Sequence, residues 1–160
     1  MRLIIAAACL AALAAPAHAQ TPRAASARDA IVPDWHQAWT DQLHFSAAVR
    51  AGDLVFLSGV VAGLPPGETE EAAMEAALER AFATLGRVLA AAGTDWDHVV
   101  DITTYHTDIT AQMPIIARVK DRYVRAPYPT WTAIDVDRLY PPAGFVEIKL
   151  IARMPDPAPP

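Results

Sequence analysis

The chain has 160 residues, of which 53% are hydrophobic, and it carries a formal net charge of −5 at pH 7. That length is enough for one compact domain with a core of its own. The acidic balance, without any run of lysine and arginine, argues against a nucleic-acid-binding protein, because neutralising phosphates requires clustered cations.

The first nineteen residues have the pattern of a secretory signal peptide. Met1–Arg2 is basic, Leu3–Ala15 is apolar but too short for a membrane anchor, and Ala17–Ala19 is a cleavage site. The single cysteine, Cys9, leaves a lipoprotein signal open as an alternative. Cleavage after residue 19 removes that cysteine, which excludes disulfides and cysteine metal sites. We therefore expect a periplasmic or secreted protein without membrane association.

Residues 20–43 are predicted to be an N-terminal extension. Thr21–Asp29 has no periodicity. Ile31–Leu43 is predicted to be a short helix, because Trp35, Trp39 and Leu43 recur every four residues on one face. Packing in the core or against another subunit is the favoured interpretation of these tryptophans, and a ligand platform is the alternative. The neighbouring His36 is expected at the surface.

Two strands are predicted next, His44–Arg50 and Leu54–Val61, joined by a tight turn at residues 51–53. Ser58 and Gly59 end the second strand. The G-x-S-x-G elbow of serine hydrolases is absent, so Ser58 is not interpreted as a nucleophile. Gly59 is expected to let the backbone approach a ligand or a neighbouring chain closely.

The middle of the chain predicts two helices separated by a strand. An apolar stripe at three- and four-residue steps predicts a long amphipathic helix from Thr69 to Gly93. Val99–Thr107 is strand-like, and Met113–Val124 is predicted to be a second helix that ends before a proline-rich segment.

The C-terminal stretch contains two further strands, Thr130–Val136 and Phe145–Ile151, with proline and glycine between them. The second strand alternates, so that one face carries Val146, Ile148 and Leu150. Glu147 therefore points to the other face, and pairing with Lys149 in solvent is the alternative to a site in a cleft. Residues 155–160 form a proline-rich tail.

The resulting order β-β-α-β-α-β-β predicts an α+β domain over residues 44–154, a mixed sheet with two helices on one face. The second face then needs cover, so oligomerisation is expected. No cofactor or metal is expected. The glycines form no phosphate loop or dinucleotide fingerprint, and about 26 Å of strand separates His98 from His106.

Two motifs resemble the Rid (YjgF-like) family of reactive-intermediate deaminases. One is V-E-I-x-x-I-A at residues 146–152, which follows a proline-led strand, and the other is the strand–turn–strand of residues 49–59 that ends in Ser-Gly. The resemblance runs from about His44 to Met154. It implies a chorismate-mutase-like fold, a homotrimer and a small-molecule cleft between subunits. The matching positions are Phe45, Gly59, Trp131, Ala133 and Glu147. By this resemblance Glu147 would hold a water that attacks a C=N carbon.

The sequence also departs from the family pattern. Trp131 occupies the position of the arginine that binds the substrate carboxylate, Phe45 that of a tyrosine, and the chain contains no asparagine. The hypothesis that follows is a ligand less anionic and more apolar than a 2-imino acid. Two functions remain open: a hydrolase of imines, enamines or related C–N bonds, and a non-catalytic trimeric module that binds small molecules.

Overall fold

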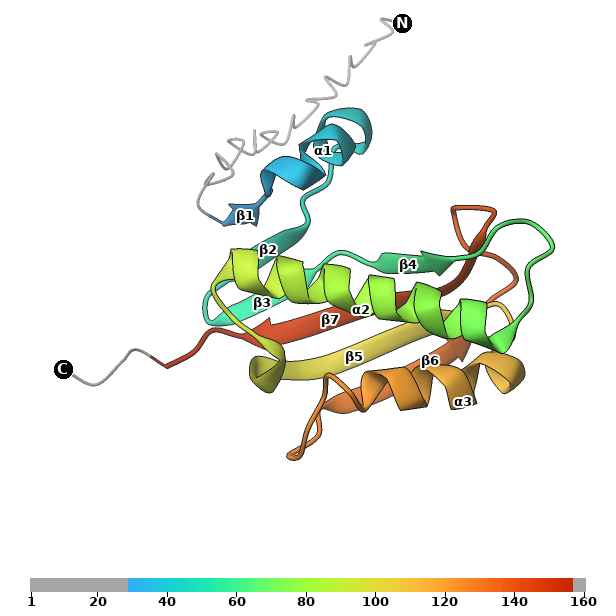
Figure 1. Cartoon of the computed structure of the whole chain (residues 1–160). Helices are drawn as coiled ribbons and strands as arrows, with labels where there is room; N and C mark the ends of the chain where they lie inside the picture. The colour runs from blue at the N-terminus through green and yellow to red at the C-terminus, as the bar shows by residue number, and fades with distance from the viewer. Residues whose placement is uncertain (1–28, 157–160) are drawn as a thin grey trace, which may run out of the picture.

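The computed structural model describes residues 29–156 (Figure 1). The predicted signal peptide, the start of the N-terminal extension and residues 157–160 lie outside the described residues. The helices and strands are β1 (Ala30–Ile31), η1 (Asp34–His36), α1 (Gln37–Leu43), β2 (Ala48–Ala51), β3 (Leu54–Leu57), β4 (Val60–Gly63), α2 (Glu71–Ala92), η2 (Trp96–His98), β5 (Val99–His106), α3 (Ile109–Lys120), β6 (Thr130–Asp135) and β7 (Gly144–Arg153). Between residues 29 and 156, no helix is long and apolar enough to cross a membrane.

The strands form one mixed sheet with β7 near its centre (Figure 1). The order is β1-β2-β3-β7-β5-β6, and β4 also pairs with β7. β5 and β6 run parallel, whereas β7 is antiparallel to β3, β4 and β5. Phe56 of β3 lies opposite Ile151, and Val60 of β4 lies opposite Ile148. Two successive strands therefore share one edge of β7, with a break at Ser58 and Gly59.

Helices α2 and α3 lie side by side on one face of this sheet (Figure 1). The buried stripe of α2 comprises Ala77, Leu78, Ala81, Phe82, Leu85, Val88 and Leu89. It packs against the alternate residues of β7, Val146, Ile148 and Leu150, all of which are fully buried. Full burial of each such side chain contributes about 1.5–3 kcal/mol. The predicted α+β architecture and the alternation of the last strand are confirmed.

Several element boundaries differ from the predictions. The strand predicted from His44 begins at Ala48. The segment predicted as one helix from Ile31 contains β1 and η1 before α1 begins at Gln37, and Pro33 precedes η1. The predicted strand 54–61 is two strands, since the chain leaves the β7 ladder at Gly59. α3 begins at Ile109 rather than Met113, because the Asp108 carboxylate caps it by accepting from the Ala111 N–H at 3.1 Å.

No helix of the described chain covers the opposite face of the sheet. Three large apolar side chains are partly exposed there: Val49 (44%), Phe56 (39%) and Ile134 (40%). Because soluble monomers seldom leave a sheet face of this kind open to water, its composition is typical of an interface.

Candidate functional site

Glu147 lies on the face of β7 that points away from the helices. Its strand register places it beside Val61 of β4 and Tyr105 of β5. Within residues 29–156 its carboxylate accepts no hydrogen bond and forms no ion pair, not even with Lys149 two residues on. An unpaired carboxylate that water can reach is free to accept a proton or hold a ligand.

Gly59 provides the space that the Glu147 side chain occupies. A Cβ at Gly59 would lie 2.7 Å from Cδ and 2.9 Å from Cγ of Glu147, and it would overlap the carboxylate oxygen Oε1. Any side chain here would displace the carboxylate. The glycine expected to admit a ligand or a neighbouring chain thus admits, in this structure, the carboxylate itself.

A cavity of about 680 Å³ opens beside this pair. Its lining includes three of the five residues predicted for the site: Phe45, Gly59 and Glu147. Its volume falls within the range of small-molecule pockets, about 300–1,000 Å³. A further cavity of about 670 Å³ also reaches Glu147, from the side of Tyr105 and Arg138. Glu147 is therefore accessible from two sides.

The N-terminal segment forms one wall of the 680 Å³ cavity. Trp35, Trp39 and Leu43 line it and remain 39%, 51% and 43% exposed. Within the described chain these three side chains are therefore not part of the core. The favoured interpretation of the sequence was packing in the core or against another subunit, so contact with a subunit and a ligand platform are the interpretations that remain. Their four-residue spacing is the signal that indicated a common face.

His36 is buried rather than exposed, so the surface expectation for it is wrong. Only 8% of it is accessible, since its ring lies edge-on against Trp35 and Phe45, with centroids 5.9 Å and 4.9 Å away. The Thr40 hydroxyl donates to the Phe45 carbonyl at 2.8 Å, which leaves its oxygen to accept from His36 Nδ1 at 3.2 Å. Burial lowers the pKa of His36. A neutral His36 therefore holds the aromatic wall together.

Ser58 also lines the cavity, but its hydroxyl is engaged. Oγ donates to the carbonyl of Ser46 at 2.7 Å, and its backbone N–H donates to the carbonyl of Ala47 at 2.9 Å. The residue fastens the end of β3 to the preceding loop. This geometry agrees with the expectation that Ser58 is not a nucleophile.

Trp131 and Ala133 lie on the opposite face of the sheet from Glu147. They pair in register with Ile102 and Thr104 of β5, both of which are buried under the helices. Trp131 Nε1 donates to the Thr104 hydroxyl at 3.0 Å. Within one chain, the five predicted residues thus form two groups on opposite faces of the sheet.

The ammonium group of Lys120 lies beside the Trp131 ring and is already paired with the Asp121 carboxylate. Lys120 Nζ is 5.2 Å from the centroid of the Trp131 ring and 2.5 Å from the Asp121 carboxylate. Lys120 is a single point charge that already pairs with Asp121, so it cannot bind a carboxylate through two N–H groups as an arginine does.

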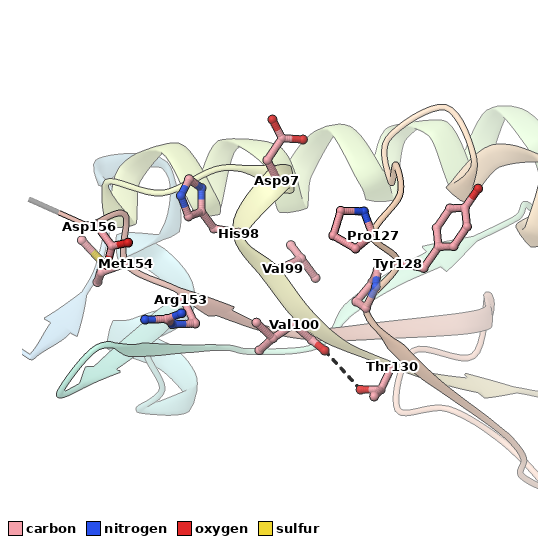
Figure 2. A pocket seen from close by; sticks show the side chains of 11 residues that line it. Asp97, His98, Val99, Val100, Pro127, Tyr128, Thr130, Arg153, Met154 and Asp156 are labelled. Atoms are coloured by element: carbon pink, nitrogen blue, oxygen red, sulfur yellow. Dashed lines mark hydrogen bonds between the residues drawn. The ribbon is translucent and has the colours of Figure 1, made fainter. Parts of the chain in front are cut away.

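A separate cavity of about 390 Å³ lies at the C-terminal end of β7, and Figure 2 shows the side chains that line it. Asp97, His98 and Arg153 line it, and the Thr130 hydroxyl donates to the carbonyl of Val100 at 3.2 Å. The cavity contains none of the five predicted site residues. In the part of the chain that the structure describes, no three histidine, cysteine or carboxylate residues gather closely enough to hold a metal ion. The Glu147 cavity is the stronger candidate site.

Comparisons with known proteins agree with this architecture. The chain matches the family model described as Endoribonuclease L-PSP over residues 36–154. It is 41% identical over 131 residues to RutC family protein YjgH of Escherichia coli (strain K12), which covers 81% of this chain and 97% of that protein. It is 32% identical over 111 residues to Reactive Intermediate Deaminase A, chloroplastic, of Arabidopsis thaliana, covering 69% of this chain and 58% of that protein.

Solved structures give the same result. The structure of protein YjgH superposes with a TM-score of 0.67 at 35% identity, covering 80% of this chain and 97% of that one. RidA from an Antarctic Psychrobacter superposes with a TM-score of 0.59 at 28% identity, covering 69% and 88%. The chain therefore belongs to the Endoribonuclease L-PSP family, the family of the YjgF, RidA and RutC proteins.

Proposed function

We propose that this protein hydrolyses C=N bonds of imines, or of enamines after they tautomerise, with Glu147 as the general base. The water oxygen bonds to the C=N carbon, the π electrons move to nitrogen, and Glu147 accepts the released proton. Return of that proton to nitrogen gives a carbinolamine. Its hydroxyl proton is then transferred to the nitrogen through Glu147, and the oxygen lone pair forms the C=O bond as the C–N bond breaks. Ammonia leaves, and a carbonyl compound is the other product.

The observation that carries this proposal is the unpaired Glu147 carboxylate held against Gly59 at the edge of a pocket. A general base must lie within hydrogen-bonding reach of its water, and no competing partner among residues 29–156 occupies this carboxylate. The likeness to a protein named Reactive Intermediate Deaminase A supports the reaction class.

The substrate that we propose is less anionic than a 2-imino acid. Trp131 stands where the arginine of the active deaminases would bind a carboxylate, and Phe45 brings a further apolar ring to the pocket. The Trp131 N–H already donates to Thr104, so the indole offers a ligand its apolar plane, which suits a neutral ring or a cation.

We further propose a homotrimer with this cleft between its subunits. Glu147, Gly59 and Phe45 would come from one subunit, and Trp131 and Ala133 from its neighbour. Two observations support this arrangement: the two groups lie on opposite faces of one chain's sheet, and the sheet face beside Glu147 is apolar and uncovered. The proposed setting is periplasmic or secreted, with a small-molecule ligand and without nucleic acid.

A non-catalytic binding module is the second candidate function. The observation that favours it is Trp131, because losing the bidentate arginine removes a substrate anchor while the pocket remains. Such a module would bind a small molecule in the same cleft and leave it unchanged.

Measuring imine hydrolysis by the purified protein and by the Glu147→Gln variant distinguishes the hydrolase from the non-catalytic binding module. Imines are generated in situ by amine and amino-acid oxidases, and ammonia release is followed. We expect Glu147→Gln, which keeps the shape and removes the base, to lower kcat about 10²-fold or more.

The matched control is Glu70→Gln, which removes the same charge from an exposed position just before α2. We expect it to leave the rate unchanged. If the unaltered protein does not accelerate hydrolysis over buffer, with either neutral or carboxylate-bearing imines, the hydrolase proposal is wrong and the binding module is favoured. Equal rates for both variants would remove Glu147 from the mechanism.

A further inference from the structure

Residues of η1 and α1 form a wall over the pocket that is larger and more apolar than a site that only holds a water would need. Trp35, Trp39 and Leu43 present three large side chains to the cavity, each about two-fifths to one-half exposed. Aromatic side chains bury large areas when they meet a ligand, and a clustered apolar surface of this kind marks a binding site. Val88 of α2 and Val61 of β4 also line the cavity and are apolar.

This wall is held in place rather than loosely attached. The Arg87 guanidinium of α2 lies 4.3 Å from the centroid of the Trp35 ring. His44 adopts a left-handed conformation (φ 57°) and donates its N–H to the Thr40 carbonyl at 2.9 Å, which ends α1 and turns the chain toward Phe45. The buried His36 joins Trp35 to Phe45. A pre-organised wall binds a ligand without first having to be ordered.

The charge of the cavity lining has one sign. Glu147 is the one formally charged residue that lines it, since His36 is held neutral by burial and no lysine or arginine of the described chain is among the lining residues. A ligand carboxylate in the 680 Å³ cavity would therefore lie beside the Glu147 carboxylate without a cation among the lining residues, since Arg87 lies over the Trp35 ring and Arg138 lines only the cavity on the other side of Glu147. A protonated imine, by contrast, is attracted by Glu147 and by the face of the Trp39 ring, whereas Arg87 already lies over Trp35.

We infer that this pocket selects protonated imines that carry an aromatic or bulky apolar substituent and no carboxylate, and that Trp35 and Trp39 are the residues that determine this selection. The inference rests on the proposed hydrolysis and names its substrate class. The apolar substituent lies against Trp35 of η1 and Trp39 of α1, and the C=NH₂⁺ group lies toward Glu147. Water and the iminium ion give a carbonyl compound and ammonium, without any oxidant or further reactant.

The kinetic test compares three imines that isolate the ring and the carboxylate. An amine oxidase produces one imine from 2-phenylethylamine and one from propylamine, and an amino-acid oxidase produces the third, with ring and carboxylate, from phenylalanine. We expect the highest kcat/KM with the first. Trp39→Ala should lower kcat/KM for that imine about tenfold, chiefly through KM, and change the propylamine product less than twofold.

Two variants serve as controls. Trp39→Phe keeps a ring and should retain most of the selectivity, and Tyr128→Ala removes an exposed ring from the other cavity and should change nothing. Equal kcat/KM for the ring-bearing and propyl imines in the unaltered protein would overturn the inference. An equal loss for both imines in Trp39→Ala would also overturn it, because the tryptophan would then act through the fold or a subunit contact.

A binding measurement separates this inference from the proposed hydrolysis. Titration calorimetry with 2-phenylethylammonium and with phenylacetate compares one ring bearing opposite charges. Tighter binding of the ammonium than of phenylacetate, with this preference lost in Trp39→Ala, supports the proposed ligand class. If the protein shows this preference but hydrolyses no imine, the proposed hydrolysis is wrong and the ligand class of the pocket still holds. Equal affinity for the two ions, or no binding of either, overturns the inference.

Discussion

Gly59 controls where the Glu147 carboxylate lies. Its φ is not positive, so the backbone would accept alanine, but a Cβ there would overlap the end of Glu147. We expect Gly59→Ala to push the carboxylate aside and lower kcat about 10²-fold, as misplacement of a catalytic group by about 1 Å does. Since the displaced group is the flexible end of a side chain, the free energy of unfolding should stay within about 1 kcal/mol. Kinetics and urea unfolding measure the two effects.

Gly52→Ala is the matched control, with the opposite expectation. Gly52 has a φ of +67° in the turn between β2 and β3, and nothing lies within 4 Å of a Cβ built there. Alanine at this position should cost about 1 kcal/mol of stability through backbone strain and leave kcat unchanged. If Gly59→Ala lost stability and activity together, the glycine would serve the fold and not the position of the carboxylate.

The position of a side chain could be predicted from the sequence where it depends on neighbouring residues, and could not be predicted where it depends on the pairing of distant strands. The outward direction of Glu147 follows from the two-residue alternation of its strand, and the structure confirms it. Its contact with Gly59 could not be predicted, because it depends on the register between β4 and β7, which are far apart in the chain. The same holds for Trp131, whose face is set by its pairing with β5.

At the scale of elements, periodicity predicted the long helices and strands well and the short N-terminal segment less well. Helix α2 is 22 residues long, and the packing of its buried stripe, from Ala77 to Leu89, agrees with the predicted period. The segment before residue 44 contains a two-residue strand, a single 3-10 turn and a seven-residue helix. Elements that short depend on tertiary contacts, such as the burial of His36, which no local pattern contains.

The contact between α2 and α3 depends on Tyr123, which follows α3. Its hydroxyl donates to the Glu79 carboxylate at 2.7 Å, and its ring stacks on Phe82 with centroids 5.1 Å apart. Burial and the bond to Glu79 raise the pKa of Tyr123 to about 12. We expect Tyr123→Phe, which keeps the stacking and loses the hydrogen bond, to lower the free energy of unfolding by about 1 kcal/mol in urea.

Arg122→Met tests whether the neighbouring ion pairs contribute as much. Arg122 pairs with Glu75 and Glu79 on the surface of the same helix pair. Exposed ion pairs contribute little, so we expect a loss below that of Tyr123→Phe, which high salt should reduce further. A larger loss for Arg122→Met than for Tyr123→Phe would assign the stability of this contact to charge rather than to the partly buried tyrosine.

At the scale of the whole molecule, the uncovered sheet face decides whether the site is complete in one chain. Glu147 lies on that face, near exposed apolar side chains such as Phe56 and Ile134, while Trp131 lies on the other. The sequence indicated this face only indirectly, by providing two long helices for a two-sided sheet. Which residues a second copy would contact depends on the twist and edges of the assembled sheet, which no local pattern specifies.

Phe56→Arg tests the proposed homotrimer. A charge at the centre of an apolar interface is costly to bury, so we expect the unaltered protein to elute with three times the mass of one chain in light scattering and the variant to dissociate. Ala83→Arg, on the exposed side of α2, is the matched control and should remain assembled. If the cleft joins two subunits, the dissociated variant should also lose imine hydrolysis although its own Glu147, Gly59 and Phe45 are intact. A monomeric unaltered protein, or a monomeric variant with full activity, would place the whole site within one chain.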